Sequence, residues 1–260
     1  MDRRTFLAAA AAGVVAVACS DGGGAKAQSP TSTSAPGPTT APASAAASTA
    51  PTTTAPTRAR FVDTGPTDHQ FVALTFHTDG DLDLAQQLLD ALAAHRIVIT
   101  SFIVGRWLDA NPAWAKKLLD GGHELANHTY NHLAFASLPP DQMRDEIVRC
   151  RDVLERLTGS PGAFFRPSGT DDGTAPPADE VLDLVGEAGY RTVLGFDVDP
   201  LDYEDPGADA VVQRTLDGVH AGAIVSLHFG HPGTIAAVPR IADGLDRRGL
   251  TAVHASQLLG

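Results

Sequence analysis

From about residue 71 to residue 254, short apolar runs alternate with amphipathic helical patterns, and this alternation limits the folds that the chain can adopt. Strands that alternate with helices form a mainly parallel sheet, because each helix returns the chain to the start of the next strand. The predicted strands are 71–76, 97–104, 124–127, 163–165, 192–196, 223–227 and 251–254. The predicted helices are 82–95, 112–120, 140–157, 178–188, 208–220 and 235–248. About seven units predict an α/β fold with a single catalytic domain, a distorted parallel (β/α)7-8 barrel.

Residues 1–19 have the pattern of a bacterial export signal. A twin arginine at 3–4 precedes an apolar run at 8–18, which is too short to span a membrane. The run ends in Ala-Val-Ala-Cys19, which resembles a lipobox with alanine in place of the usual leucine. We therefore expect an exported protein, lipid-anchored through Cys19 at the outer face of the cytoplasmic membrane.

The composition of residues 20–60 differs from that of residues 61–260 and predicts a tether followed by a domain. Residues 20–60 are almost all Ala, Ser, Thr, Pro and Gly, and such a stretch buries too little apolar surface to offset its ordering entropy. We predict a disordered tether there and one domain over 61–260. The formal net charge of −12 argues against nucleic acid and against attraction to anionic lipid. The lipid anchor is the one membrane contact expected, and a monomer is expected.

His128 and His132 lie four residues apart, which is about one helical turn. Two imidazoles at this spacing can share one face and point at one metal ion. Imidazole suits zinc and related divalent ions, and a catalytic site adds a carboxylate and leaves one position open for water. The alternative is a pair of ordinary surface or half-buried histidines.

Further polar residues follow the ends of the predicted strands, where a barrel of this kind carries its functional groups. These runs resemble, in order, the five motifs of the polysaccharide deacetylase family, the NodB homology domain of carbohydrate esterase family 4. The later four are His-Thr-Tyr-Asn-His at 128–132, Arg-Pro-Ser-Gly at 166–169, Asp-Pro-Leu-Asp-Tyr at 199–203 and Leu-His at 227–228. In the family the fourth motif ends in Trp, where this chain has Tyr.

The first motif departs from the family pattern Thr-Phe-Asp-Asp-Gly, whose aspartates supply a general base and then a metal ligand. Here His77 and Thr78 follow Thr-Phe, and Asp79 and Asp81 come later. A divergent branch with a Thr-Phe-His-Gly-x-Gly-Asp pattern favours Asp81 as the ligand and Asp79 as the base. In the alternative, Asp79 is the ligand, and His77 or Thr78 stands at the position of the base.

The resemblance implies one divalent metal ion held by Asp81, His128 and His132. Zinc is the first choice, with cobalt or nickel as alternatives. The ion would polarise an acetyl carbonyl and lower the pKa of bound water. Asp79 is then the first candidate for the base and His77 the second.

The resemblance also implies a proton donor for the departing group. His228 is the candidate acid, supported by Asp202, with Asp199 as the less favoured partner. Arg166 would orient the base and depress its pKa.

These features predict a metal-dependent hydrolase that removes acetyl groups from an envelope polysaccharide, and the location favours peptidoglycan or another N-acetylated glycan. One alternative is a non-catalytic glycan- or metal-binding lipoprotein on the same fold, which the altered first motif favours. Another is a hydrolase of small non-peptide amides.

Overall fold

The structure, a computed structural model, describes residues 58–170 and 172–260, so the predictions for residues 1–57 lie outside it. The strands are β1 (Arg60–Val62), β2 (Phe71–Thr78), β3 (Thr100–Ile103), β4 (Glu124–Asn127), β5 (Thr192–Leu194), β6 (Ile224–His228) and β7 (Thr251–Val253). The helices are α1 (Leu82–Ala94), α2 (Gly105–Ala110), α3 (Ala113–Asp120), α4 (Pro140–Thr158), α5 (Asp179–Glu187), α6 (Ala208–Gly218), α7 (Pro232–Arg247) and α8 (Ala255–Leu259), with 3-10 turns η1 (Phe135–Ser137) and η2 (Asp202–Glu204). Among these described helices, none combines the length and the apolar character that crossing a membrane requires.

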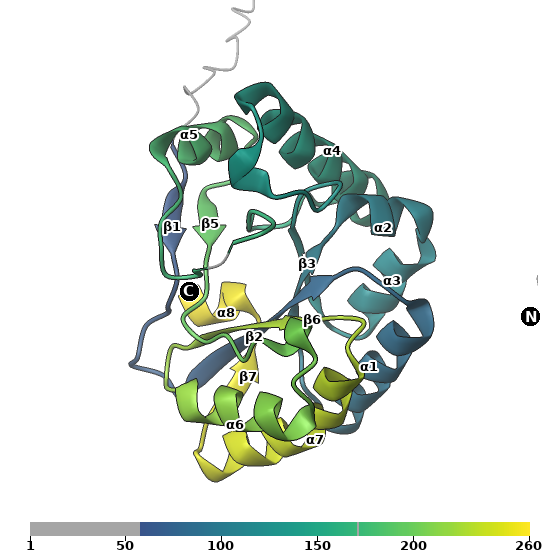
Figure 1. Cartoon of the computed structure of the whole chain (residues 1–260), viewed down its shortest axis with the longest axis vertical. Helices are drawn as coiled ribbons and strands as arrows, with labels where there is room; N and C mark the ends of the chain where they lie inside the picture. Colours follow the sequence, from purple (N-terminus) through teal and green to yellow (C-terminus); the bar gives the residue numbers. More distant parts are fainter. Residues whose placement is uncertain (1–57, 171) are drawn as a thin grey trace, which may run out of the picture. The chain divides into compact units, whose positions relative to one another are not determined.

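The strands form an interrupted parallel barrel surrounded by helices (Figure 1). One sheet has the order β4-β3-β2-β6, with β7 paired to the start of β2, and a second sheet pairs β1 with β5. Every strand pair is parallel. Isolated bridges connect the two sheets, from Phe165 to Asn127 and to Val193 and from Val198 to Val225. The predicted distorted barrel is confirmed.

The core explains why the predicted elements form. Strand β2 has buried residues on both faces, as a strand in a parallel sheet covered by helices must. Helix α1 buries Ala85, Leu88, Leu89 and Leu92, the i, i+3, i+4, i+7 stripe of an amphipathic helix.

Four differences from the predicted elements concern short segments. No strand forms at 163–165, where only Phe165 makes bridges, because the segment lies between the left-handed Gly162 (φ 81°) and Pro167, which has no N–H to extend a ladder. Strand β1 and helices α2 and α8 were not predicted, since segments this short carry little periodicity.

Candidate active site

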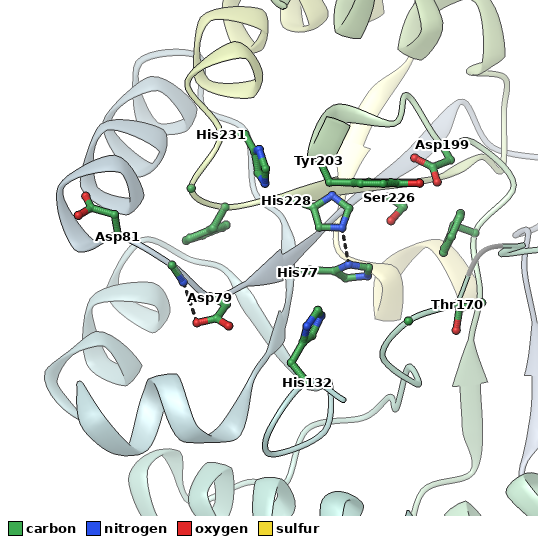
Figure 2. A pocket seen from close by; sticks show the side chains of 15 residues that line it. His77, Asp79, Asp81, His132, Thr170, Asp199, Tyr203, Ser226, His228 and His231 are labelled. Carbon is green, nitrogen blue, oxygen red and sulfur yellow. Dashed lines mark hydrogen bonds between the residues drawn. The ribbon is translucent and has the colours of Figure 1, made fainter. Parts of the chain in front are cut away.

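A cavity of about 510 Å³ lies at the carboxyl ends of β2 and β6 (Figure 2). Predicted site residues Asp79, Asp81, His132 and His228 line it. The other predicted site residues, His128, Arg166 and Asp202, are almost completely buried. His128 and Arg166 contact His77, and Asp202 contacts His228. The barrel therefore gathers residues from all five motifs around one cavity.

His128 and His132 are brought together by a loop and not by a helix. Their ring centroids lie 4.9 Å apart. The backbone is left-handed at Thr129 (φ 67°) and at His132 (φ 59°). Instead of helical bonds, the carbonyls of Thr129 and Tyr130 accept from the backbone N–H groups of α2. A loop, and not a helical turn, therefore gives the two imidazoles their shared direction.

His128 has the hydrogen-bond pattern of a metal-ligating histidine. Its Nδ1 lies 2.9 Å from the carbonyl oxygen of Arg166, which can only accept, so Nδ1 carries the hydrogen. Its Nε2 is then a bare lone pair, buried and without a hydrogen-bond partner among the described residues. Burial, followed by the charge of neighbouring His132, lowers the pKa of His128 well below its usual value, so the ring is neutral. A neutral imidazole that donates its second N–H to a carbonyl fits a divalent metal ion.

The two candidate carboxylates differ in their surroundings. Asp81 is exposed and caps α1, where its Oδ1 accepts from the N–H groups of Asp83 at 2.9 Å and Leu84 at 3.0 Å. Asp79 accepts at 3.0 Å from the Arg106 guanidinium. Burial lowers the pKa of His132, and the negative charge of Asp79 partly opposes this effect.

Figure 2 shows the Asp79 carboxylate on the side of His132, with the Asp81 side chain directed away. Over residues 58–170 and 172–260, no three His, Cys, Asp or Glu side chains are already placed to hold a metal ion. The histidine pair suits a divalent ion because His128 is neutral and its Nε2 is bare, whereas the Asp79 carboxylate is bonded to Arg106.

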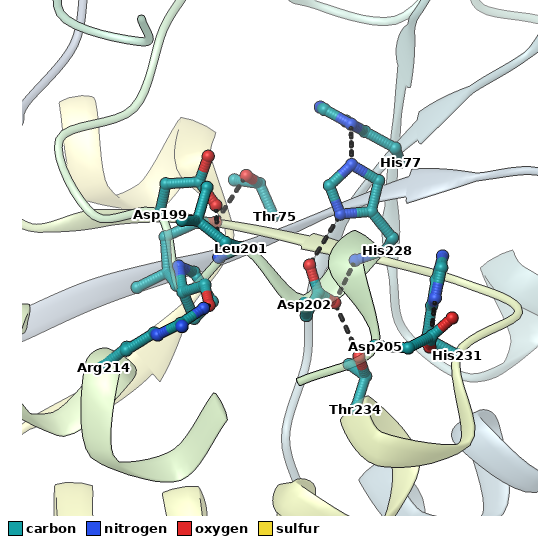
Figure 3. Close-up of polar contacts among 12 residues, drawn as sticks. Thr75, His77, Asp199, Leu201, Asp202, Asp205, Arg214, His228, His231 and Thr234 are labelled. Carbon is teal, nitrogen blue, oxygen red and sulfur yellow. Dashed lines mark hydrogen bonds and ion pairs between the residues drawn. The ribbon is translucent and has the colours of Figure 1, made fainter. Parts of the chain in front are cut away.

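His228 and Asp202 form a buried acid–base pair (Figure 3). The Asp202 Oδ1 accepts at 2.7 Å from Nδ1 of His228, and its Oδ2 accepts at 2.9 Å from the His228 backbone N–H. Thr234 donates its hydroxyl to the same Oδ2 at 2.6 Å. Asp202 is 1% exposed, whereas His228 reaches the cavity. The carboxylate thus fixes the ring and places the hydrogen on Nδ1.

His77 joins this pair to Arg166. In the parallel register of β2 and β6, His77 lies opposite His228, and its Nδ1 is 2.8 Å from Nε2 of His228. On its other side, Nε2 of His77 is 3.2 Å from the Nη1 of Arg166, which can only donate. Arg166 can only donate, and the Asp202 carboxylate can only accept. The three hydrogen bonds, from Arg166 to His77, from His77 to His228 and from His228 to Asp202, therefore all run in the same direction. Nδ1 carries the hydrogen in both histidines.

Arg166 is a buried cation whose direct partners are neutral. It donates to the carbonyls of Leu194 and Gly195, to the Thr75 hydroxyl and to His77. Burial lowers its pKa to about 9, and the charge of Asp199 partly opposes this. Of the two candidates for the base, Arg166 contacts His77, the second choice, whereas Asp79, the first choice, is bonded by Arg106.

Other residues complete the rim of the cavity. Burial raises the pKa of Asp199, whose carboxylate accepts from the Leu201 N–H at 2.8 Å. Tyr203 is 46% exposed, and its ring lies 5.2 Å from the His228 ring. His231 also lines the cavity and bonds Asp205 at 2.9 Å.

The sequence analysis missed the roles of Arg106 and Thr234, which bond Asp79 and Asp202. Arg106 lies in a helix too short to predict, and Thr234 belongs to no motif. No signal in the sequence marks either residue.

The fold and the cavity define a class of protein, the parallel α/β barrels with a histidine-lined site at the carboxyl ends of their strands. Residues 64–193 match the family described as "Polysaccharide deacetylase". The chain belongs to this family.

A peptidoglycan-N-acetylglucosamine deacetylase of Bacillus cereus is 31% identical over 166 residues, 64% of this chain and 75% of that protein. The solved structure of the Bc1960 peptidoglycan N-acetylglucosamine deacetylase is 26% identical, with a TM-score of 0.70 over 76% of this chain and 92% of that chain. Another solved structure, BA3943 from Bacillus anthracis, is described as a CE4 family pseudoenzyme. It is also 26% identical, with a TM-score of 0.70 over 77% of this chain and 69% of that one.

Proposed function

We propose that this protein is a metal-dependent carbohydrate deacetylase that removes acetyl groups from an N-acetylated envelope polysaccharide, with peptidoglycan as the first candidate. Membership of the polysaccharide deacetylase family supports the activity, and a relative named as a peptidoglycan deacetylase supports the substrate. The observation that carries the proposal is the His228–Asp202 pair in the same cavity as His132, next to the bare Nε2 of His128.

We assign the metal to His128, His132 and Asp79. Asp79 replaces Asp81 in this proposal. Asp81 caps α1 and points away, whereas the negative charge of Asp79 acts on His132 and partly offsets the fall in its pKa that burial causes. When bound, the divalent ion would polarise the acetyl carbonyl and stabilise the oxyanion. Zinc is the first choice, because two imidazoles and one carboxylate suit it, with cobalt or nickel as alternatives.

Proton transfer is assigned to His228. Asp202 holds its Nδ1–H, so Nε2 is the atom assigned to take a proton from water and return it to the departing amine, once its bond to Nδ1 of His77 opens. Burial lowers the pKa of His77 well below its usual value, which makes His77 a poor base. Asp79, once a ligand, is no longer available as the base.

Location is also part of the proposal. Export and a lipid anchor at Cys19, predicted from residues 1–19, would hold the domain beside the cell wall, and we propose that it acts there as a monomer.

Acetate release tests the function. The full chain is stripped of metal, reloaded with zinc, cobalt or nickel, and given N-acetylglucosamine oligomers or peptidoglycan, with His132→Ala as the control. We expect metal-dependent release that the variant lacks. Release only from small amides would instead identify a hydrolase of another substrate class.

A second candidate is a non-catalytic glycan-binding protein on the same fold. The observation in its favour is His77 at the position of the family's first aspartate, and one solved relative is described as a pseudoenzyme. Glycan binding by a zinc-loaded chain that releases no acetate would support this candidate.

A further inference from the structure

A buried carboxylate outside the cavity, Glu146 of α4, bonds the loop that carries the histidine pair. Glu146 is 3% exposed. Its Oε2 accepts from the backbone N–H of Tyr130 at 3.0 Å and of Asn131 at 2.7 Å. Its Oε1 accepts from the Asn131 side-chain amide at 2.6 Å. All three bonds reach the residues between His128 and His132.

The loop needs such a partner. Left-handed backbone at Thr129 and His132 is unfavourable for residues other than glycine, so the surrounding structure must hold it. Because no helix forms, the N–H groups of Tyr130 and Asn131 have no helical acceptor. Without Glu146 these donors would lose their partners beside a buried region, which is costly.

The opposite side of the loop is held by α2. The N–H of Gly105 donates to the carbonyl of Thr129, and that of Arg106 donates to the carbonyl of Tyr130, both at 2.9 Å. The loop is therefore clamped between α2, which binds its carbonyls, and α4, which binds its N–H groups.

We propose that Glu146 is a positioning residue for the metal site: it holds the 128–132 loop in the left-handed form that turns His128 and His132 toward one point. The metal-binding part of this inference rests on the proposed function, whereas the clamping of the loop does not. Glu146 acts through the backbone and touches neither substrate nor metal.

Three variants of the full chain separate geometry from charge. Glu146→Leu removes every acceptor. Glu146→Gln keeps one oxygen for both backbone N–H groups, and its amide can pair with a flipped Asn131 side chain. Glu155→Leu, at an exposed glutamate on the same helix, is the matched control.

Amide hydrogen exchange and zinc titration calorimetry are the readouts. In Glu146→Leu we expect faster exchange at Tyr130 and Asn131, by about tenfold or more, with protection retained in β2. Zinc affinity should fall roughly 10–100-fold, as when a partner that supports a metal ligand is lost. Glu146→Gln and Glu155→Leu should resemble the unmodified chain in both measurements.

Unchanged exchange at Tyr130 and Asn131 in Glu146→Leu would overturn the clamp. Faster exchange with unchanged zinc affinity would overturn the positioning role. An unmodified chain that binds no zinc contradicts the proposed metal site and the positioning role with it, while the exchange data still decide the clamp. If Glu146→Leu loses protection throughout, Glu146→Asp, which withdraws the carboxylate by one methylene, must raise exchange at the same two amides.

Discussion

The Asp202 carboxylate holds the His228 ring with two oxygens, of which one accepts from the ring and the other from the backbone and Thr234. Asp202→Asn keeps the size but replaces an acceptor with a donor, which opposes the hydrogen on Nδ1. We expect the kcat for acetate release to fall by roughly 10²–10⁴-fold with little change in KM. Steady-state kinetics check this result.

Asp205→Asn is the matched control, because Asp205 pairs with His231 on the rim of the same cavity. Its kcat should stay within a few-fold of the unmodified chain. Equal losses in the two variants would contradict the assignment of proton transfer to His228.

The residue types at the site could be predicted from the sequence, but their partners could not. The motifs identified His128, His132, Arg166, Asp202 and His228, and the structure gathers them around one cavity. The bond between His77 and His228 depends on the register of two strands that lie far apart in the chain. No local pattern encodes that register.

At the scale of elements, Asp81 is the N-cap of α1, and its capping bonds compete with metal binding for the same carboxylate. We expect Asp81→Ala to lower the free energy of unfolding by about 1 kcal/mol, as loss of a helix cap does, without weakening zinc binding. Urea denaturation and zinc titration measure the two effects.

Asp79→Asn is the reciprocal variant. It should weaken zinc binding, because Asp79 is the carboxylate proposed as ligand, while α1 keeps its cap. A loss of zinc affinity in Asp81→Ala with none in Asp79→Asn would restore the assignment made from sequence.

Most elements could be predicted because long helices and buried strands have strong periodicity. Helix α4 begins at Pro140, as predicted, and ends at Thr158, followed by the C-cap Gly159, which adopts a left-handed backbone. The sequence analysis assigned no helix or strand to 128–132, and this segment forms a loop because tertiary bonds from α2 and α4 replace local ones.

At the scale of the whole molecule, buried His123 links stability to pH. Burial lowers its pKa from 6.5 to about 4, and its Nδ1 accepts from the Ile99 N–H at 3.3 Å. The unfolded chain binds the proton more readily than the folded chain does. The contribution of neutral His123 to the free energy of unfolding is therefore complete above pH 6.5 and is lost as the pH falls toward 4. One such group is worth about 3 kcal/mol across that window.

Urea denaturation at several pH values tests this linkage. His123→Gln should reduce the dependence of the unfolding free energy on pH between 6.5 and 4. His69→Gln, at an exposed histidine, should leave that dependence unchanged. Equal slopes in His123→Gln and the unmodified chain would contradict the linkage.

The hydrogen bonds that connect Arg166 through His77 and His228 to Asp202 all run in one direction, and histidine at position 77 sets that direction. An aspartate there would only accept, so His228 would face a carboxylate at each ring nitrogen and would have to carry two hydrogens. With His77 as the donor, His228 carries one. The departure in the first motif therefore sets the number of hydrogens on an imidazole of a different strand, and it makes Nε2 of His228 an acceptor.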